Sequence, residues 1–195
     1  MPLETTGPAN KEFPVSAEKT YTAPEAEREY DPEYQGQQSE TALQALITRI
    51  EQEIQELHFP AFSQADAVSL GLLLVELGST RALPIAIDIR RHDHILFHAA
   101  LPGATPDNDS WIERKSRTAE RYALPSLLVG LRNRVGGGRI EDFAWFDVKQ
   151  YTADGGSFPI YVSGTGPIGT VTVSGLPQKA DHELVVEALR AFAAK

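Results

Sequence analysis

The chain has 195 residues, which is enough for one domain with a full hydrophobic core. It contains no cysteine, so disulfides, thiolate metal sites and cysteine nucleophiles are excluded. Its net charge of -9 is uneven: residues 1–40 hold nine acidic and three basic residues, a net of -6, and the remainder carries only -3. The folded part therefore offers no broad basic surface for nucleic acid or anionic lipid.

The first 38 residues are rich in Pro, Glu, Thr and Ala, and we expect a disordered or loosely docked acidic tail there. Four spaced aromatic residues support the docked alternative over a disordered tail, because such residues can bind a partner surface: Phe13, Tyr21, Tyr30 and Tyr34. No basic stretch followed by an apolar one stands at the start, and the longest apolar run, around Leu70 to Leu77, is too short to cross a bilayer. We expect a cytoplasmic protein with no membrane partner, whose folded domain spans residues 39–195.

The first part of this domain shows helical spacing. Apolar residues three and four apart predict a helix from a cap at Ser39 to about Leu57. The segment HFPAF is expected to end it as a loop, and Ser63 with Asp66 forms a variant capping pattern for a second helix. That helix is apolar almost all round, which predicts burial against a sheet.

The stretch RHDHILFH holds three of the five histidines and raises the question of a metal or haem site. Strand-like runs on either side of His92-Asp93 predict a two-residue hairpin turn, because Asp and His tolerate positive φ. His98 then lies among isoleucines on the apolar face, where a histidine is most often a hydrogen-bonded core residue and less often a ligand. The predicted register pairs Arg91 with His94, Ile89 with Leu96, Ile87 with His98, and Ile85 with Ala100, with Asp88 opposite Phe97 and Arg90 opposite Ile95 on the other face.

The second half alternates helices and strands. After the turn-rich loop LPGATPDNDS, a helix is expected to begin at Trp111 with Ser110 or Asp109 as its cap, and Leu124-Pro125 separates it from a helical piece that ends near Asn133. FPIYV and GTVTVSG have strand patterns, and DHELVVEALRAF predicts a C-terminal helix with apolar residues inward. Helices and antiparallel hairpins in this order predict a single α+β domain layered on an antiparallel sheet.

The segment GTGPIG matches the dinucleotide-binding pattern at Gly164, Gly166 and Gly169. That function needs a helix directly after the motif, whereas the strand-like TVTVSG follows, so we expect a glycine hairpin. No serine-hydrolase or compact zinc motif is present, and we expect no metal site.

Two further stretches carry charged candidates. In WIERKSRTAERY the arginines form either a solvated face paired with glutamates or, with Lys115, an anion contact. His182 is expected in the first turn of the last helix, either as an exposed neighbour of the cap or as a ligand contact at the helix N-terminus.

Several of these segments together resemble the GlcG/HbpS-like superfamily, often labelled haem-degrading domain, and within it a subfamily to which no reaction is assigned. The resemblance covers about residues 45–192. The matching segments are LPGATPDNDSWIERKSRTAERY, GGSFPI, IGTVTVSGLPQ and DHELVVEAL, with SQADAVSLGLLLVEL and ALPIAIDIR in support.

The resemblance implies a profilin-like α/β/α domain that assembles into symmetric homo-oligomers and binds a small molecule, with haem as one candidate cofactor. It implies candidate ligand-binding residues at Lys115, Gly155, Gly156, Ser174, Asp181 and His182. Where relatives often have a histidine before the glycine pair, this chain has Asp154. Two alternatives stay open: a non-catalytic interaction module that uses the acidic tail, and haem-degrading redox chemistry.

Overall fold

A five-stranded sheet with helices on both faces forms the body of the computed structural model, which describes residues 40–194. The strand order is β1-β4-β5-β2-β3, and neighbours are antiparallel except for the parallel pair β1 and β4. The strands are β1 (His58–Phe59), β2 (Ala86–Arg91), β3 (His94–Ala100), β4 (Ser157–Val162) and β5 (Gly166–Ser174). The predicted layered α+β fold is confirmed. The short strand β1 lies in HFPAF, where the sequence predicts a loop. The strand was not predicted because two residues are too few to show an alternating pattern.

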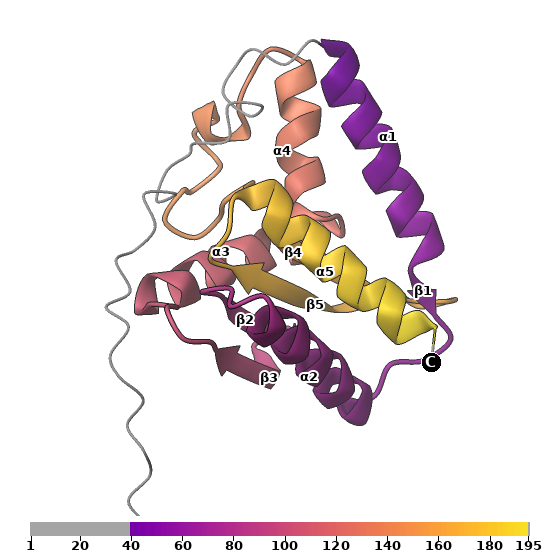
Figure 1. The fold of residues 1–195 in the computed structure, drawn as a ribbon. Helices are drawn as coiled ribbons and strands as arrows, with labels where there is room; N and C mark the ends of the chain where they lie inside the picture. Colours follow the sequence, from indigo (N-terminus) through magenta and orange to yellow (C-terminus); the bar gives the residue numbers. More distant parts are fainter. Residues whose placement is uncertain (1–39, 195) are drawn as a thin grey trace, which may run out of the picture.

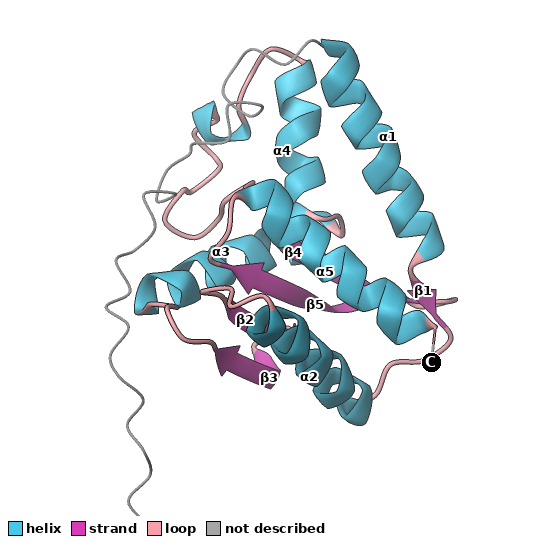
Figure 2. Cartoon of the chain, in the orientation of Figure 1, coloured by secondary structure: helices cyan, strands magenta, loops and turns pink. Residues whose placement is uncertain are grey.

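Five helices surround this sheet (Figure 1). Helices α2 and α5 cover one face, α3 covers the other, and α1 packs beside α4 (Figure 2). Their bounds are α1 (Glu40–Glu56), α2 (Gln64–Thr80), α3 (Pro106–Tyr122), α4 (Ser126–Val135) and α5 (Gln178–Ala193), with a short 3-10 helix η1 (Ile140–Asp142) after α4. No helix among residues 40–194 combines the length and the apolar character needed to cross a membrane. The predicted tail, residues 1–38, and its aromatic residues lie outside the described residues.

The sequence predicts the start of helix α2 correctly but not the start of α3. At α2 the predicted cap is confirmed: Ser63 N donates to Asp66 Oδ2 at 2.7 Å, and Asp66 N donates to Ser63 Oγ at 3.2 Å. The expected start of α3 at Trp111 is wrong, because the helix begins at Pro106 after a Thr105 cap. Proline suits the first helical position, so the turn-rich composition there belongs to the first turn of the helix.

The sheet has one apolar and one polar face. Ile87 and Ile89 of β2 pair with Val173 and Val171 of β5, and with Phe158 they form a fully buried apolar surface beneath α2 and α5. The alternate residues point toward α3 and are mostly polar. The polar ones are Asp88, Arg90, His98, Ser157, Thr170, Thr172 and Ser174. The helix α3 therefore covers an unusually polar sheet surface.

The hairpin turn at His92-Asp93 is confirmed, and His92 has a φ of 53°. The predicted register is right only beside the turn. A β-bulge gives Ile89 the partner Phe97 and Arg90 the partner Ile95, so Leu96 is the extra residue. Beyond the bulge every pair is shifted by one residue, and Asp88 lies opposite His98. The prediction that His98 is a core residue on the apolar face is therefore wrong: its side chain faces α3 and is 38 % exposed.

Other predictions are mixed. The glycine motif forms the predicted hairpin between β4 and β5, with positive φ at Gly164 and Gly166. The inward apolar residues of α5 are buried as predicted. The expected burial of α2 on all sides is wrong for its outer face, where Val68 and Leu72 are exposed.

Candidate functional site

Lys115 and Asp181 form a buried ion pair at one end of the polar face. Lys115 comes from the middle of α3 and Asp181 from the first turn of α5, and their Nζ and Oδ2 atoms are 2.7 Å apart. Lys115 Nζ also donates to the backbone oxygen of Val173 at 3.3 Å. Charged side chains are rarely this enclosed without a partner, so the pair compensates for the loss of water around both groups.

The surroundings of Asp181 shift its proton affinity. Burial raises its pKa to about 6, although Lys115 and the backbone N–H groups of Leu176 and Gly175 oppose the shift. Leu176 N donates to Asp181 Oδ1 at 3.0 Å. A carboxyl group with a pKa near 6 exchanges a proton close to neutral pH, which is a property of many functional sites as well as of some structural pairs.

The two glycines of the predicted turn fit tightly against this pair. Gly156 has a φ of 123°, and a Cβ atom there would lie 2.9 Å from Lys115 Nζ and 2.4 Å from the backbone oxygen of Val173. At Gly155 a Cβ atom would lie 2.3 Å from the backbone oxygen of Gln178. Only glycine therefore allows the chain to pass between α3 and α5 at this point.

His182 lies next to Asp181 but faces a different element. The helix α5 begins at Gln178, so His182 is in its second turn and is fully buried, which contradicts the expected place in the first turn and the exposed alternative. Its Nε2 atom is 2.9 Å from Glu53 Oε2 on α1, and its Nδ1 atom is buried without a hydrogen-bond partner.

Glu53 is not among the residues that the sequence analysis predicts for the site, although its position in the sequence carries a signal. It lies three residues after Ile50 and four before Leu57, so it occupies the buried stripe of α1 and is 3 % exposed. A glutamate in an apolar stripe predicts a buried partner. Here that partner is His182, and the pair joins α1 to α5.

Ser174 ends β5 and is buried opposite Ala86. Lys115, Gly155, Gly156 and Asp181 are thus brought together at the end of the sheet, while His182 turns toward α1. The other residue of interest, Asp154, accepts a hydrogen bond from Thr152 Oγ1 just before the glycine pair.

A second polar cluster lies further along the α3 face. Arg90 makes two hydrogen bonds to the fully buried Asp88, with Nη2 at 3.0 Å from Oδ2. His98 lies between two carboxylates, with Nδ1 3.6 Å from Asp88 Oδ2 and Nε2 3.5 Å from Asp109 Oδ1. Across residues 40–194, no three or more His, Asp or Glu side chains are arranged to hold a metal ion.

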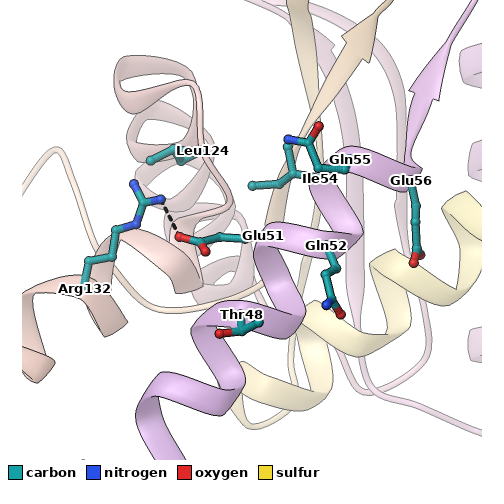
Figure 3. Close-up of a pocket in the computed structure, with 8 residues that line it drawn as sticks. All are labelled: Thr48, Glu51, Gln52, Ile54, Gln55, Glu56, Leu124 and Arg132. Carbon is teal, nitrogen blue, oxygen red and sulfur yellow. Dashed lines mark hydrogen bonds and ion pairs between the residues drawn. The ribbon is translucent and has the colours of Figure 1, made fainter.

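An open groove of about 630 Å³ lies elsewhere, between α1 and the connection from α3 to α4 (Figure 3). The ion pair of Arg132 Nη2 and Glu51 Oε1, 2.7 Å long, crosses one side of it. None of the six candidate residues lines this groove. The buried cluster is the stronger candidate, because enclosed and paired charges indicate a built site, whereas the side chains that line this groove are mostly exposed on an open surface.

Comparison with known proteins identifies the fold and the family. The family model described as haem degrading protein HbpS-like matches residues 62–190. The chain belongs to the HbpS-like family. It is 52 % identical over 154 residues to a UPF0303 protein of Streptomyces avermitilis, which covers 79 % of this chain and 94 % of that protein. It is 50 % identical over 149 residues to a UPF0303 protein of Rhizobium etli, with coverages of 76 % and 90 %. The predicted family is confirmed.

Solved structures of this fold agree with the architecture. The structure of Ybr137w has a TM-score of 0.72 and 30 % identity, and the match covers 80 % of this chain and 92 % of that one. HbpS has a TM-score of 0.52 at 20 % identity, covering 70 % and 89 %. A complex named PduOC:Heme has a TM-score of 0.58 at 19 % identity, covering 67 % and 94 %. The last two show that the fold is shared.

Proposed function

We propose that this HbpS-like domain binds a small anionic ligand at the cluster of Lys115, Gly156 and Asp181, and that it works as a homo-oligomer. The proposal rests on one observation: the buried ion pair of Lys115 and Asp181 packs directly against Gly156, where there is no room for a Cβ atom. The family match supports a ligand-binding role.

The chemistry follows from the two charged groups. The ammonium group of Lys115 can pair with a carboxylate of a ligand. In the structure, the carboxylate of Asp181 takes this place beside Lys115. When Asp181 takes up a proton, it no longer neutralises Lys115, and an incoming anion replaces the lost charge. Because burial raises the pKa of Asp181 to about 6, this exchange needs only mildly acidic conditions. Anion binding at this site is therefore coupled to uptake of one proton.

Haem is one candidate ligand, supported by the family description and by the haem named in the PduOC complex. The candidate residues do not fit axial ligation of its iron. Among them only His182 has an imidazole, and that ring is fully enclosed beside Phe158 with its Nε2 atom against Glu53. We therefore propose no iron–histidine bond at this cluster, and the carboxylates of a porphyrin are the groups that Lys115 would contact once Asp181 is protonated.

The test is a titration of the full chain with haemin and, separately, with metal-free protoporphyrin IX. Saturable absorbance changes with both, at similar affinity and weakened at least tenfold by Lys115→Met, are the expected result. Stronger binding at pH 5.5 than at pH 7.5 is expected for the wild type and is lost in Asp181→Asn. Absence of saturable binding of either porphyrin would overturn haem as the ligand. A Lys115→Met protein that binds as well as the wild type would overturn the site.

A further inference from the structure

An exposed aromatic cluster lies in the loop between α4 and β4. Of the six large apolar side chains that are exposed among residues 40–194, three lie close together in this loop: Phe143, Trp145 and Val148. The rings of Phe143 and Trp145 stack, with their centroids 5.6 Å apart. Large apolar side chains that gather on one exposed surface mark a contact site, so this loop is a candidate docking surface.

Arg121, at the end of α3, adds a positive charge to these rings. Its guanidinium carbon lies 5.4 Å from the ring centroid of Trp145, 4.9 Å from that of Tyr151 and 5.7 Å from that of Tyr122. Among the described residues, no carboxylate forms an ion pair with Arg121. A guanidinium that stacks on rings still has N–H groups at its edge that can bind an anion. We call Arg121, Tyr122, Phe143, Trp145 and Tyr151 the Arg121–aromatic cluster.

The acidic side chains near the Arg121–aromatic cluster have other partners. Asp147 accepts hydrogen bonds from the backbone N–H of Lys149 and from Gln150 Nε2, both at 3.0 Å. Glu120 Oε1 contacts Nδ1 of His92. The cluster therefore suits a segment that brings its own carboxylates and aromatic rings.

The N-terminal part of the chain contains a segment of this chemistry. Residues 25–34 read EAEREYDPEY, which places five acidic residues and one basic residue, a net charge of -4, around Tyr30 and Tyr34. Carboxylates of this segment can bind the guanidinium of Arg121, and its tyrosine rings can stack on the exposed rings of the cluster.

The same segment is long enough to reach the cluster. Leu124 lines the groove beside Ile54 of α1, and it also packs, like Tyr122, against the small core beneath the cluster. In Figure 1, α4 ends beside α1, and the chain continues from there into the loop that carries the aromatic rings. Ile54 lies about 21 Å along α1 from Glu40, whereas the ten residues from Tyr30 to Glu40 span up to about 33 Å.

We propose that residues 25–34 dock on the Arg121–aromatic cluster of the same chain. The segment is tethered to α1, which gives it a roughly millimolar effective concentration at the cluster, so individually weak ionic and stacking contacts suffice. A separate molecule of the same chemistry lacks this advantage. The inference gives the acidic tail a binding surface and does not depend on the proposed ligand site.

The test uses the full chain, in which Ala26→Cys creates a single cysteine for attachment of bimane, a small dye that tryptophan quenches on contact. Trp145→Phe keeps an aromatic ring but removes the quencher, so it is expected to raise the dye emission at least twofold. Trp111→Phe is the matched control, because Trp111 is the other tryptophan of the chain, and it should leave the emission unchanged. Unchanged emission in Trp145→Phe would overturn the proposal.

A second comparison tests the charge contact. Arg121→Gln should raise the emission at least twofold, and so should an increase in salt from about 20 mM to about 500 mM, because both weaken ionic contacts. Arg81→Gln is the control, since Arg81 is also exposed but pairs with Glu187 of α5. Equal emission from the two arginine variants would contradict the role of Arg121.

A mixing experiment separates docking within one chain from docking between copies. Labelled chains are unfolded in urea and refolded together with about a tenfold excess of unlabelled Trp145→Phe chains. Docking within the chain keeps the emission quenched, because each labelled segment still meets its own Trp145. A rise in emission would show that the segment docks on another copy, which would overturn the proposal.

Discussion

Lys115 on α3 and Asp181 on α5 meet at 2.7 Å with 4 % and 0 % of their side chains exposed, so each is the main compensation for the other's buried charge. Lys115→Met leaves Asp181 uncompensated, and we expect a loss of about 3–5 kcal/mol in the free energy of unfolding. The measurement is urea denaturation at pH 7. Combining Lys115→Met with Asp181→Leu should restore part of that loss, because no lone charge then remains.

A matched control for this pair is Arg132→Met. Arg132 pairs with Glu51 at the same distance of 2.7 Å, but about half of each side chain is exposed. Exposed pairs contribute about 0–1 kcal/mol, so this variant should unfold close to the wild type. Equal losses from Lys115→Met and Arg132→Met would contradict the importance of burial.

The same pair predicts a dependence of stability on pH. The pKa of Asp181 is about 6 in the folded protein, whereas an aspartate in the unfolded chain has a pKa of 3.8. The folded state therefore binds the proton of Asp181 more tightly than the unfolded state does. Asp181 therefore favours folding most below pH 4, and this contribution falls, by roughly 3 kcal/mol in total, as the pH rises from 4 to 6. Asp181→Asn removes this titration. The unfolding free energy of the wild type minus that of the variant should decrease across this range, and parallel pH profiles would refute the prediction.

Gly156 tests the close passage of the chain beside the ion pair. In Gly156→Ala the new methyl group meets Lys115 Nζ and the oxygen of Val173 at a backbone φ of 123°, so we expect a loss of about 2–5 kcal/mol. Gly138→Ala is the control, because no atom lies within 4 Å of the added Cβ position there. It should change stability by less than about 0.5 kcal/mol. Thermal unfolding of both variants measures these two losses of stability. If Gly156→Ala is as stable as the wild type, the backbone at position 156 must be able to move away from Lys115 and Val173.

The order and type of the long helices and strands were predictable because each has a strong local pattern. Apolar spacing located α1 and α5, and the cap at Ser63 located the start of α2. The start of α3 was missed because turn-forming residues also fit a first helical turn. The bulge at Ile89 and Arg90 was missed because an extra residue in one strand leaves no mark in its alternation. That one-residue shift moved His98 to the opposite face of the sheet.

The site shows a similar division. Family resemblance brought Lys115, the glycine pair and Asp181 to attention, and the fold does place them in contact. Their burial and pairing were not predictable, because they depend on α3 and α5 meeting across the end of the sheet. The link of His182 to Glu53 joins residues 129 positions apart in sequence, and no local pattern reports such a contact.

We expect the two histidines beside the hairpin turn, His92 and His94, to be dispensable for both stability and ligand binding. His92 is 77 % exposed and its Nδ1 atom contacts Glu120 Oε1, and His94 is also exposed. The double variant His92→Asn with His94→Gln should change the unfolding free energy by less than about 1 kcal/mol, since asparagine also tolerates the positive φ at position 92. Porphyrin titration of this variant should match that of the wild type. A lost ligand would instead assign these histidines a binding role.

Two threonines on β5 separate the effect of an unpaired buried hydroxyl from that of a paired one. Thr170 and Thr172 point to the same polar face and are 3 % and 0 % exposed. Thr170 Oγ1 has no hydrogen-bond partner, whereas Thr172 Oγ1 lies 2.8 Å from Ser157 Oγ.

Thr170→Val removes a desolvated hydroxyl while keeping the shape of the side chain, so we expect the free energy of unfolding to rise by about 1 kcal/mol. Thr172→Val leaves the Ser157 hydroxyl unpaired and should cost about 1–3 kcal/mol. Because the two substitutions are chemically identical and lie on one strand, opposite signs in urea denaturation isolate the hydrogen bond as the cause. Equal losses would show that the Thr170 hydroxyl has a partner in solution.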